Sequence, residues 1–113
     1  MKDERLYLVH MQERCHRIRT FIECGREVFF ESDQTQDAVI RNLEVIGEAA
    51  KRVGPELRVL LPKLDWRAIC GMRDVLIHGY IAVDLEEVWN VAINYIPVLD
   101  DALRQFLIAD NIS

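Results

Sequence analysis

The stretch "SDQTQDAVIRNLEVIGEAAKRVGP", residues 32–55, decides the fold class because it encodes one complete helix together with its start and its end. Ser32 or Asp33 can cap this helix, and Asp33 with Gln36 has the spacing of a capping box. The Gly-Pro pair at its end stops the pattern, since proline cannot continue the hydrogen-bond ladder. Between these signals, apolar side chains recur every three or four residues, as on one helical face: Val39, Leu43, Ile46, Ala50 and Val53.

The same period recurs on both sides of this stretch. From Arg5 it predicts a first helix, which Gly25 can end. The stripe of that helix is Leu8, Met11, Cys15, Ile18 and Ile22. Asp84 and Glu87 form another capping box, which opens a last helix that Pro97 should kink or divide in two. The stripe of the last helix is Val88, Ala92, Ile96 or Tyr95, Leu99, Leu103 and Phe106.

Between these helices, Asp65 is expected to cap a further helix that starts at Trp66 and runs to about His78. The connector before it, "PELRVLLPKLD", is bounded by prolines and has room for one turn of helix. No alternation with the period of a strand competes with these helical patterns. The sequence therefore predicts one all-α domain over residues 1–113, a bundle of helices with short connections.

Gly47 and Ala50 stand one helical turn apart in the stretch 32–55. Glycine lowers helix stability relative to alanine, so we expect a packing reason for Gly47, namely that another helix approaches closely. Glu48 lies between these two small residues. We expect it to pair with Arg52 at i+4 rather than to act in a site.

The net charge of −5 argues against a nucleic-acid-binding protein, but the distribution of charge along the chain does not. Residues 1–73 hold 13 Lys and Arg against 12 Asp and Glu, whereas residues 74–113 hold one basic residue against seven acidic ones. The acidity therefore belongs to the C-terminal third. A local basic cluster, Arg14, Arg17 and Arg19, is by itself interpreted as a solvated helix face.

The composition predicts a cytoplasmic protein. No apolar run approaches the ~20 residues that span a bilayer, and the charged start "MKDERLYLVH" lacks the apolar core of a signal peptide. Cys15, Cys24 and Cys70 are odd in number and lack the C-x2-C spacing of zinc and redox motifs. We expect all three to be small buried hydrophobic residues.

The candidate site is the polar motif "RDVLIHGY", which begins at Arg73. Four residues separate Arg73 from His78, and Tyr80 follows two positions later. Arg5 and His10 have the same separation but no following tyrosine. The pair formed by Arg73 and His78 is therefore the specific one.

Two interpretations of the motif remain open from the residues alone. In the structural one, Arg73 pairs with a surface carboxylate, His78 caps a helix and Tyr80 packs in the core. In the functional one, a two-fold axis brings two Arg/His pairs together at one seam. There the guanidinium groups bind phosphate and histidine exchanges a proton near neutral pH. No cluster of Asp, Glu and His has metal-ligand spacing, so this reaction is expected to need no metal or other cofactor.

Three stretches resemble the HepT-like toxins, which belong to the HEPN superfamily: "AVIRNLEVIGEAAKRV", "DWRAICGMRDVLIHGY" and "VDLEEVWNVAINYIPVL". The resemblance covers nearly the whole chain in the right order, including Phe29 and Phe30 before the second helix. Family members often have a proline before the tryptophan, whereas Asp65 precedes Trp66 here. That difference changes a helix cap rather than a catalytic group.

The resemblance implies a four- to five-helix up-down bundle of HEPN type that forms a homodimer. It implies a toxin that cleaves RNA without a metal, at a composite site made from the Arg-x4-His motifs of both subunits. Arg73 and His78 match the catalytic residues, and Asp74 matches the polar position that supports them. Tyr80 matches the tyrosine that a cognate minimal nucleotidyltransferase antitoxin modifies with AMP.

The alternative is a non-catalytic partner, a nucleotide-binding or adaptor subunit that docks a nucleotidyltransferase. An intact pair of Arg73 and His78 favours the enzyme. Gly47, Ala50 and the helix that carries the motif are expected at or near a two-fold interface.

Overall fold

A computed structural model describes residues 3–72 and 83–112, with side chains as far as residue 110. The chain forms α1 (Arg5–Phe21), a 3-10 turn (Ile22–Cys24), α2 (Arg26–Glu31), α3 (Asp33–Lys51), α4 (Pro55–Arg58), α5 (Trp66–Cys70), α7 (Leu85–Asn90), a π-helical segment (Val91–Tyr95) and α8 (Ile96–Ile112). Neither described range contains a strand. The prediction of an all-α bundle is therefore confirmed.

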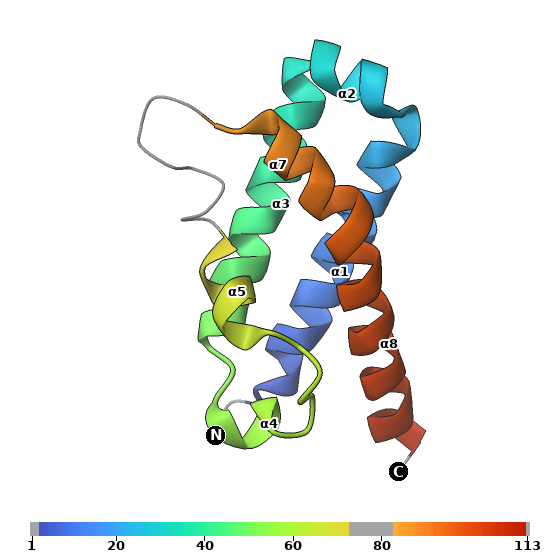
Figure 1. Cartoon of the computed structure of the whole chain (residues 1–113). Coiled ribbons are helices and arrows are strands. Elements are labelled where there is room, and N and C mark those ends of the chain that lie inside the picture. The colour runs from blue at the N-terminus through green and yellow to red at the C-terminus, as the bar shows by residue number, and fades with distance from the viewer. Residues whose placement is uncertain (1–2, 73–82, 113) are drawn as a thin grey trace.

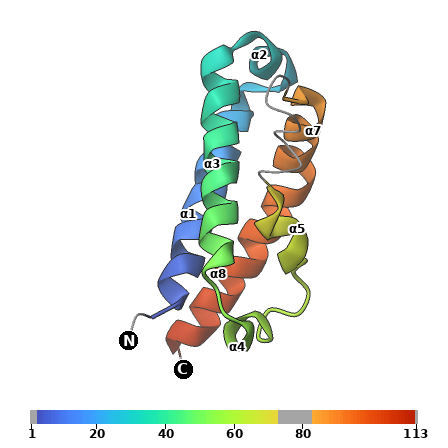
Figure 2. The same ribbon diagram turned by 90° about the vertical axis from the view of Figure 1, so that its left-hand side faces the viewer.

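The long helices α1, α3 and α8 form the body of the bundle, with α1 packed against both of the others (Figures 1 and 2). The helix α2 closes one end, and α4 lies at the other end together with both chain termini (Figure 1). The helix α5 lies on α3 (Figure 2), and α7 leads through the π-helical segment into α8. No described helix combines the length and the apolar character that crossing a membrane requires.

The core consists of the faces that the three stripes predict. With Ile96 rather than Tyr95 in the last stripe, every stripe residue is buried except Ile22 and Phe106, which are partly buried at the two ends of the bundle. At the α2 end, the ring of Phe29 lies 5.2 Å from that of Trp89 on α7, measured between centroids. This aromatic contact joins α2 to α7 and closes the core there.

The helix starts follow local capping chemistry. The Asp65 carboxylate accepts from the backbone N–H of Ala68 at 3.0 Å, and Asp84 caps α7 in the same way. Both predicted caps are confirmed. At α3, the hydroxyl of Ser32 is the cap, and the side-chain amide of Gln36 donates to backbone carbonyls of α2. The predicted capping box of Asp33 and Gln36 was therefore wrong.

Two local features differ from the sequence prediction, and a third agrees with it. Gly25 has φ 91° and ends the 3-10 turn, but the short helix α2 that follows it was not predicted. The helix that starts at Trp66 ends at Cys70 with Gly71 as its C-cap, and Met72 is again helical; the rest of the predicted course to His78 lies outside the described residues. Pro97 interrupts the last helix as expected, and the interruption is the π-helical segment just before it.

The cysteines do not share one environment. Cys15 is fully buried, Cys70 is half-buried and Cys24 is exposed in the 3-10 turn. The prediction of three buried cysteines was therefore wrong for Cys24, because the helix that would have buried it has already ended. Burial, and next the negative charge of Asp100, raises the pKa of the Cys15 thiol well above its usual range.

Candidate functional site

The four predicted site residues, Arg73, Asp74, His78 and Tyr80, lie outside the described residues. The structure describes the segments on both sides of them, which end at Met72 and resume at Val83. Both flanking helices, α5 and α7, contact α3. The two helices that flank the motif are therefore both positioned by packing on α3.

Gly47 lies where the backbone of α5 meets α3. A Cβ atom on Gly47 would be 3.2 Å from the carbonyl oxygen of Ile69 and 3.5 Å from that of Cys70. The expected close approach of another helix is thus confirmed, but that helix belongs to the same chain. Gly47 and Ala50 are both buried within the chain. Their place at or near a two-fold interface stays a prediction.

Arg58 connects the end of α3 to α5. Its Nε donates to the carbonyl of Val53 at 2.8 Å, and its Nη2 donates to that of Ala50 at 3.0 Å. The same Nη2 lies 3.4 Å from the Sγ of Cys70, and the guanidinium lies 5.3 Å from the centroid of the Trp66 ring. Arg58 therefore supplies donors to the last turn of α3 and contacts the first and last residues of α5. No local sequence pattern marks it, because its partners come from separate segments.

Tyr95 lies close to the start of α5. Its hydroxyl is buried and faces the backbone N–H of Asp65, but no described residue reaches it with the geometry of a full hydrogen bond. Burial, and next the negative charge of Asp65, raises the pKa of the Tyr95 phenol. The hydroxyl is therefore protonated near neutral pH and withdrawn from solvent.

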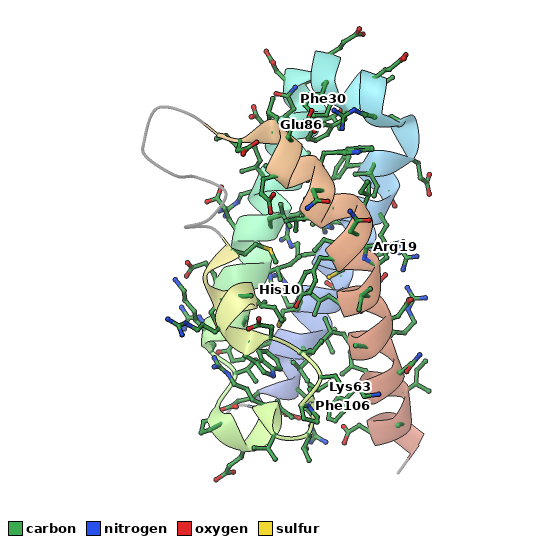
Figure 3. The ribbon with its side chains drawn as sticks, in the orientation of Figure 1. His10, Arg19, Phe30, Lys63, Glu86 and Phe106 are labelled. Carbon is green, nitrogen blue, oxygen red and sulfur yellow. The ribbon has the colours of Figure 1, made fainter. Side chains whose placement is uncertain are left out.

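The segment that follows the motif begins with α7, and contacts with α2 hold it in place. The guanidinium of Arg26 pairs with the carboxylate of Glu86 and lies 4.5 Å above the ring of Phe30. Figure 3 shows Phe30 and Glu86 together at this end of the bundle. The aromatic pair Phe29 and Phe30, which the sequence analysis singled out, thus anchors the start of α7.

Charge is segregated between the two flanks of the motif. The segment 51–72 carries five cations and two carboxylates: Lys51, Arg52, Arg58, Lys63 and Arg67 against Glu56 and Asp65. The segment 83–112 carries one cation and six carboxylates: Arg104 against Asp84, Glu86, Glu87, Asp100, Asp101 and Asp110. An anionic ligand is therefore favoured on the α5 flank and disfavoured on the α7 flank.

Glu48 pairs with Lys51 at 3.5 Å, whereas it was predicted to pair with Arg52.

In the second Arg-x4-His pair, Arg5 and His10, the arginine has a structural role. The guanidinium of Arg5 pairs with Asp3 at 3.1 Å and with Asp110 at 2.7 Å, which joins the start of α1 to the end of α8. These residues line a groove of about 780 Å³ together with Leu57, Leu60 and Phe106. His10 lies on α1 (Figure 3).

Sequence reasoning missed a buried carboxylate. Asp100 is fully buried on α8 and accepts from Gln12 at 2.9 Å, Arg19 at 2.9 Å and Arg104 at 3.2 Å. Arg19, labelled in Figure 3, comes from the basic cluster of α1, and this network joins α1 to α8. Its donors compensate the buried charge. In the described part of the chain, no group of three His, Cys, Asp or Glu side chains is arranged to hold a metal ion.

Comparison with known proteins identifies relatives over most of the chain. The family model described as Ribonuclease HepT-like matches residues 11–106. A Methanocaldococcus jannaschii protein named as gamma-glutamylcyclotransferase and candidate RNase is 37% identical over 107 residues, which cover 94% of this chain and 48% of that protein. A candidate RNase of Caldanaerobacter subterraneus subsp. tengcongensis is 37% identical over 112 residues, covering 95% and 96% of the two chains.

A third relative, named probable ribonuclease HepT, comes from Thermococcus cleftensis. It is 38% identical over 94 residues, which cover 80% of this chain and 86% of the relative. The chain thus spans about half the length of the first relative and nearly all of the second. No solved structure gave a significant match.

Proposed function

The chain belongs to the HepT-like ribonuclease family, and from this premise we propose that it is the toxin of a toxin–antitoxin pair. In this proposal the toxin is an endoribonuclease whose site forms across a homodimer. The observation that carries the proposal is the intact motif of Arg73, His78 and Tyr80 within the stretch that the family model matches. The basic α5 flank beside the motif supports an anionic substrate.

In the proposed reaction, the 2′-oxygen of one nucleotide forms a bond to the adjacent phosphorus while the bond to the 5′-oxygen breaks. The products are a 2′,3′-cyclic phosphate and a 5′-hydroxyl. His78 transfers a proton between the attacking 2′-hydroxyl and the leaving 5′-oxygen. Arg73 binds the phosphate and stabilises the charge that develops on it, and Asp74 orients these two side chains. Each site takes motifs from both subunits, so cleavage requires the homodimer.

Regulation in this proposal acts through Tyr80. A cognate minimal nucleotidyltransferase antitoxin transfers AMP from ATP to the phenol oxygen, which loses its proton while pyrophosphate leaves. The product carries about one added negative charge per phosphodiester beside the residues that receive RNA. Both charge repulsion and bulk then oppose RNA binding. Tyr95 is a poor competing acceptor, because its hydroxyl is buried inside the bundle.

The catalytic proposal is tested with three variants that share one readout, cleavage of RNA by the purified protein. Arg73→Ala and His78→Ala should each abolish cleavage and toxicity while helical content stays at the wild-type level. His10→Ala should cleave normally, because the pair of Arg5 and His10 belongs to no site. Cleavage should also continue in EDTA. Loss in EDTA with rescue by a divalent cation would refute the metal-free mechanism, and an inactive wild type that still binds a nucleotidyltransferase would favour the adaptor alternative.

The regulatory proposal is tested by intact-mass measurement after incubation with the nucleotidyltransferase and ATP. Wild type should gain the mass of AMP, whereas Tyr80→Phe should gain none and should remain toxic in the presence of the partner. If AMP is found on Tyr7 or Tyr95, or if the partner still neutralises the toxicity of Tyr80→Phe, then Tyr80 is not the regulated residue. Light scattering after gel filtration tests the homodimer, and a monomer at micromolar concentration would remove the basis of the composite site.

A further inference from the structure

We propose that RNA extends from the site across the α5 flank, where Arg52, Lys63 and Arg67 contact phosphates beside the scissile one. This inference rests on the proposed ribonuclease function and adds the direction in which the substrate runs. The three cations are called the α5-flank cations below. They are proposed to bind the RNA backbone without taking part in the chemical step.

The α5-flank cations are exposed, and the structure gives none of them an ion pair or a side-chain hydrogen bond within the described ranges. Two other cations, Arg58 and Arg26, are already engaged within the chain. Arg58 is bonded to backbone carbonyls, and Arg26 pairs with Glu86. The α5-flank cations therefore keep their charge available for a ligand from solvent.

Their positions place them around one short helix that leads toward the motif. Arg67 is on the exposed side of α5, opposite the buried residues Trp66 and Ile69, and stands six positions before Arg73. Lys63 lies on the connector before α5, beside Phe106 of α8 (Figure 3), and its Cα can be at most ~14 Å from that of Arg67, four positions later. Arg52 is the C-cap residue of α3.

Contacts of Arg58 bring Arg52 into the same neighbourhood. The carbonyl of Val53, next to Arg52 in the chain, accepts from Arg58 at 2.8 Å, and the guanidinium of Arg58 lies over the ring of Trp66. The end of α3 and the start of α5 are thus joined by one side chain. A strand of RNA that runs along the connector and over α5 toward the motif would pass Lys63 and Arg67, with Arg52 at the adjoining end of α3.

The opposite route is electrostatically unfavourable. The α7 flank begins with Asp84, Glu86 and Glu87, of which only Glu86 has a cationic partner among the described residues, Arg26. Like charges on RNA and on this flank repel one another, although salt screens that repulsion over roughly 10 Å. The substrate is therefore directed to one side of the motif.

The expected size of the effect follows from counterion release. Each phosphate contact on a single strand adds about 0.7 to the slope of log affinity against log salt concentration. At about 0.1 M salt, this corresponds to roughly a fivefold gain in affinity for each contact. Removing all three contacts should weaken binding about 100-fold and reduce the slope by about 2.

The experiment measures binding of a fluorescein-labelled single-stranded RNA of mixed sequence by anisotropy, over a series of salt concentrations. His78→Ala serves as the background, so that the RNA is not cleaved during the measurement. The triple variant Arg52→Gln, Lys63→Gln, Arg67→Gln is compared with this background, and Arg67→Gln alone is compared with Arg17→Gln. Arg17 is a matched control because it is an exposed arginine in the groove that α1 and α8 form.

We expect the triple variant to lose about 100-fold in affinity and Arg67→Gln about fivefold, with Arg17→Gln unchanged. In the cleavage-competent protein, the triple variant should raise KM on long RNA and leave kcat and the cleavage of a dinucleotide intact. An unchanged affinity and salt slope, or an equal loss in Arg17→Gln, would overturn the inference. Failure of the proposed function is a separate result, because a wild-type protein that cleaves no RNA still permits this comparison of RNA affinities.

Discussion

Replacing Gly47 by alanine tests whether the close contact of α3 with α5 matters for both stability and activity. Two opposing terms decide the effect on the free energy of unfolding. Alanine in a helix interior is favoured over glycine by about 1 kcal/mol. The new methyl group would lie 3.2 Å from the Ile69 carbonyl oxygen, so α5 has to move away by a few tenths of an ångström.

That movement is opposed by the contacts that hold α5. Trp66 and Ile69 are buried, and Arg58 contacts both Trp66 and Cys70. Overpacking of this kind costs about 1–3 kcal/mol. After the helix-propensity gain, Gly47→Ala should therefore be destabilised by about 0–2 kcal/mol. Gly47→Val adds two methyl groups and a lower helix propensity, so it should be less stable than the alanine variant.

Activity should respond more clearly than stability. Cys70 stands three positions before Arg73, so a displaced α5 moves the start of the segment that carries the motif. A misplacement of ~1 Å costs about 100-fold in rate, and a few tenths of an ångström then corresponds to roughly a two- to tenfold loss. The assay combines urea denaturation, followed by circular dichroism, with kcat for RNA cleavage by the folded variant.

Gly54→Ala is the matched control. Its Cβ would lie 3.1 Å from Glu4, which is closer than the contact at Gly47, but the neighbour is the end of a flexible side chain that can move. This variant should keep the wild-type kcat. If Gly47→Ala gains the full ~1 kcal/mol and cleaves at the wild-type rate, α5 is not held against α3 as we describe.

Three further predictions concern the core and the thiols. Leu43→Ala should lower the free energy of unfolding by about 2–5 kcal/mol, because Leu43 is fully buried, and a loss below about 0.5 kcal/mol in urea denaturation would contradict its place in the core. Tyr95→Phe removes a buried hydroxyl that lacks a hydrogen-bond partner within the described ranges, so it should raise the free energy of unfolding by about 1–3 kcal/mol. A variant less stable than wild type would show that the hydroxyl does form a hydrogen bond. Iodoacetamide should label the exposed Cys24 in the native protein well before Cys15, whose thiol is buried and has a raised pKa, and equal rates measured by mass spectrometry would refute this order.

The sequence by itself determined the features that depend on neighbours along the chain. The stripe with intervals of three and four residues identified the buried faces of α1, α3 and α8, because a helix brings such residues to one side whatever surrounds it. The caps at Asp65 and Asp84 were predictable because their partners lie three residues away. The motif with Arg73 and His78 was recognised in the same local way, and its roles remain proposals.

Tertiary structure decided which surfaces meet. The sequence indicated a packing reason at Gly47, but only the fold shows that its neighbour is the backbone of α5 in the same chain and not a second subunit. Likewise, Asp100 and Asp101 are adjacent acidic residues in the sequence. Asp100 is buried because donors from α1 and α8 converge on it, whereas Asp101 is exposed. Such contacts join residues far apart in the chain, and their energy depends on how helices pack, which local periodicity does not specify.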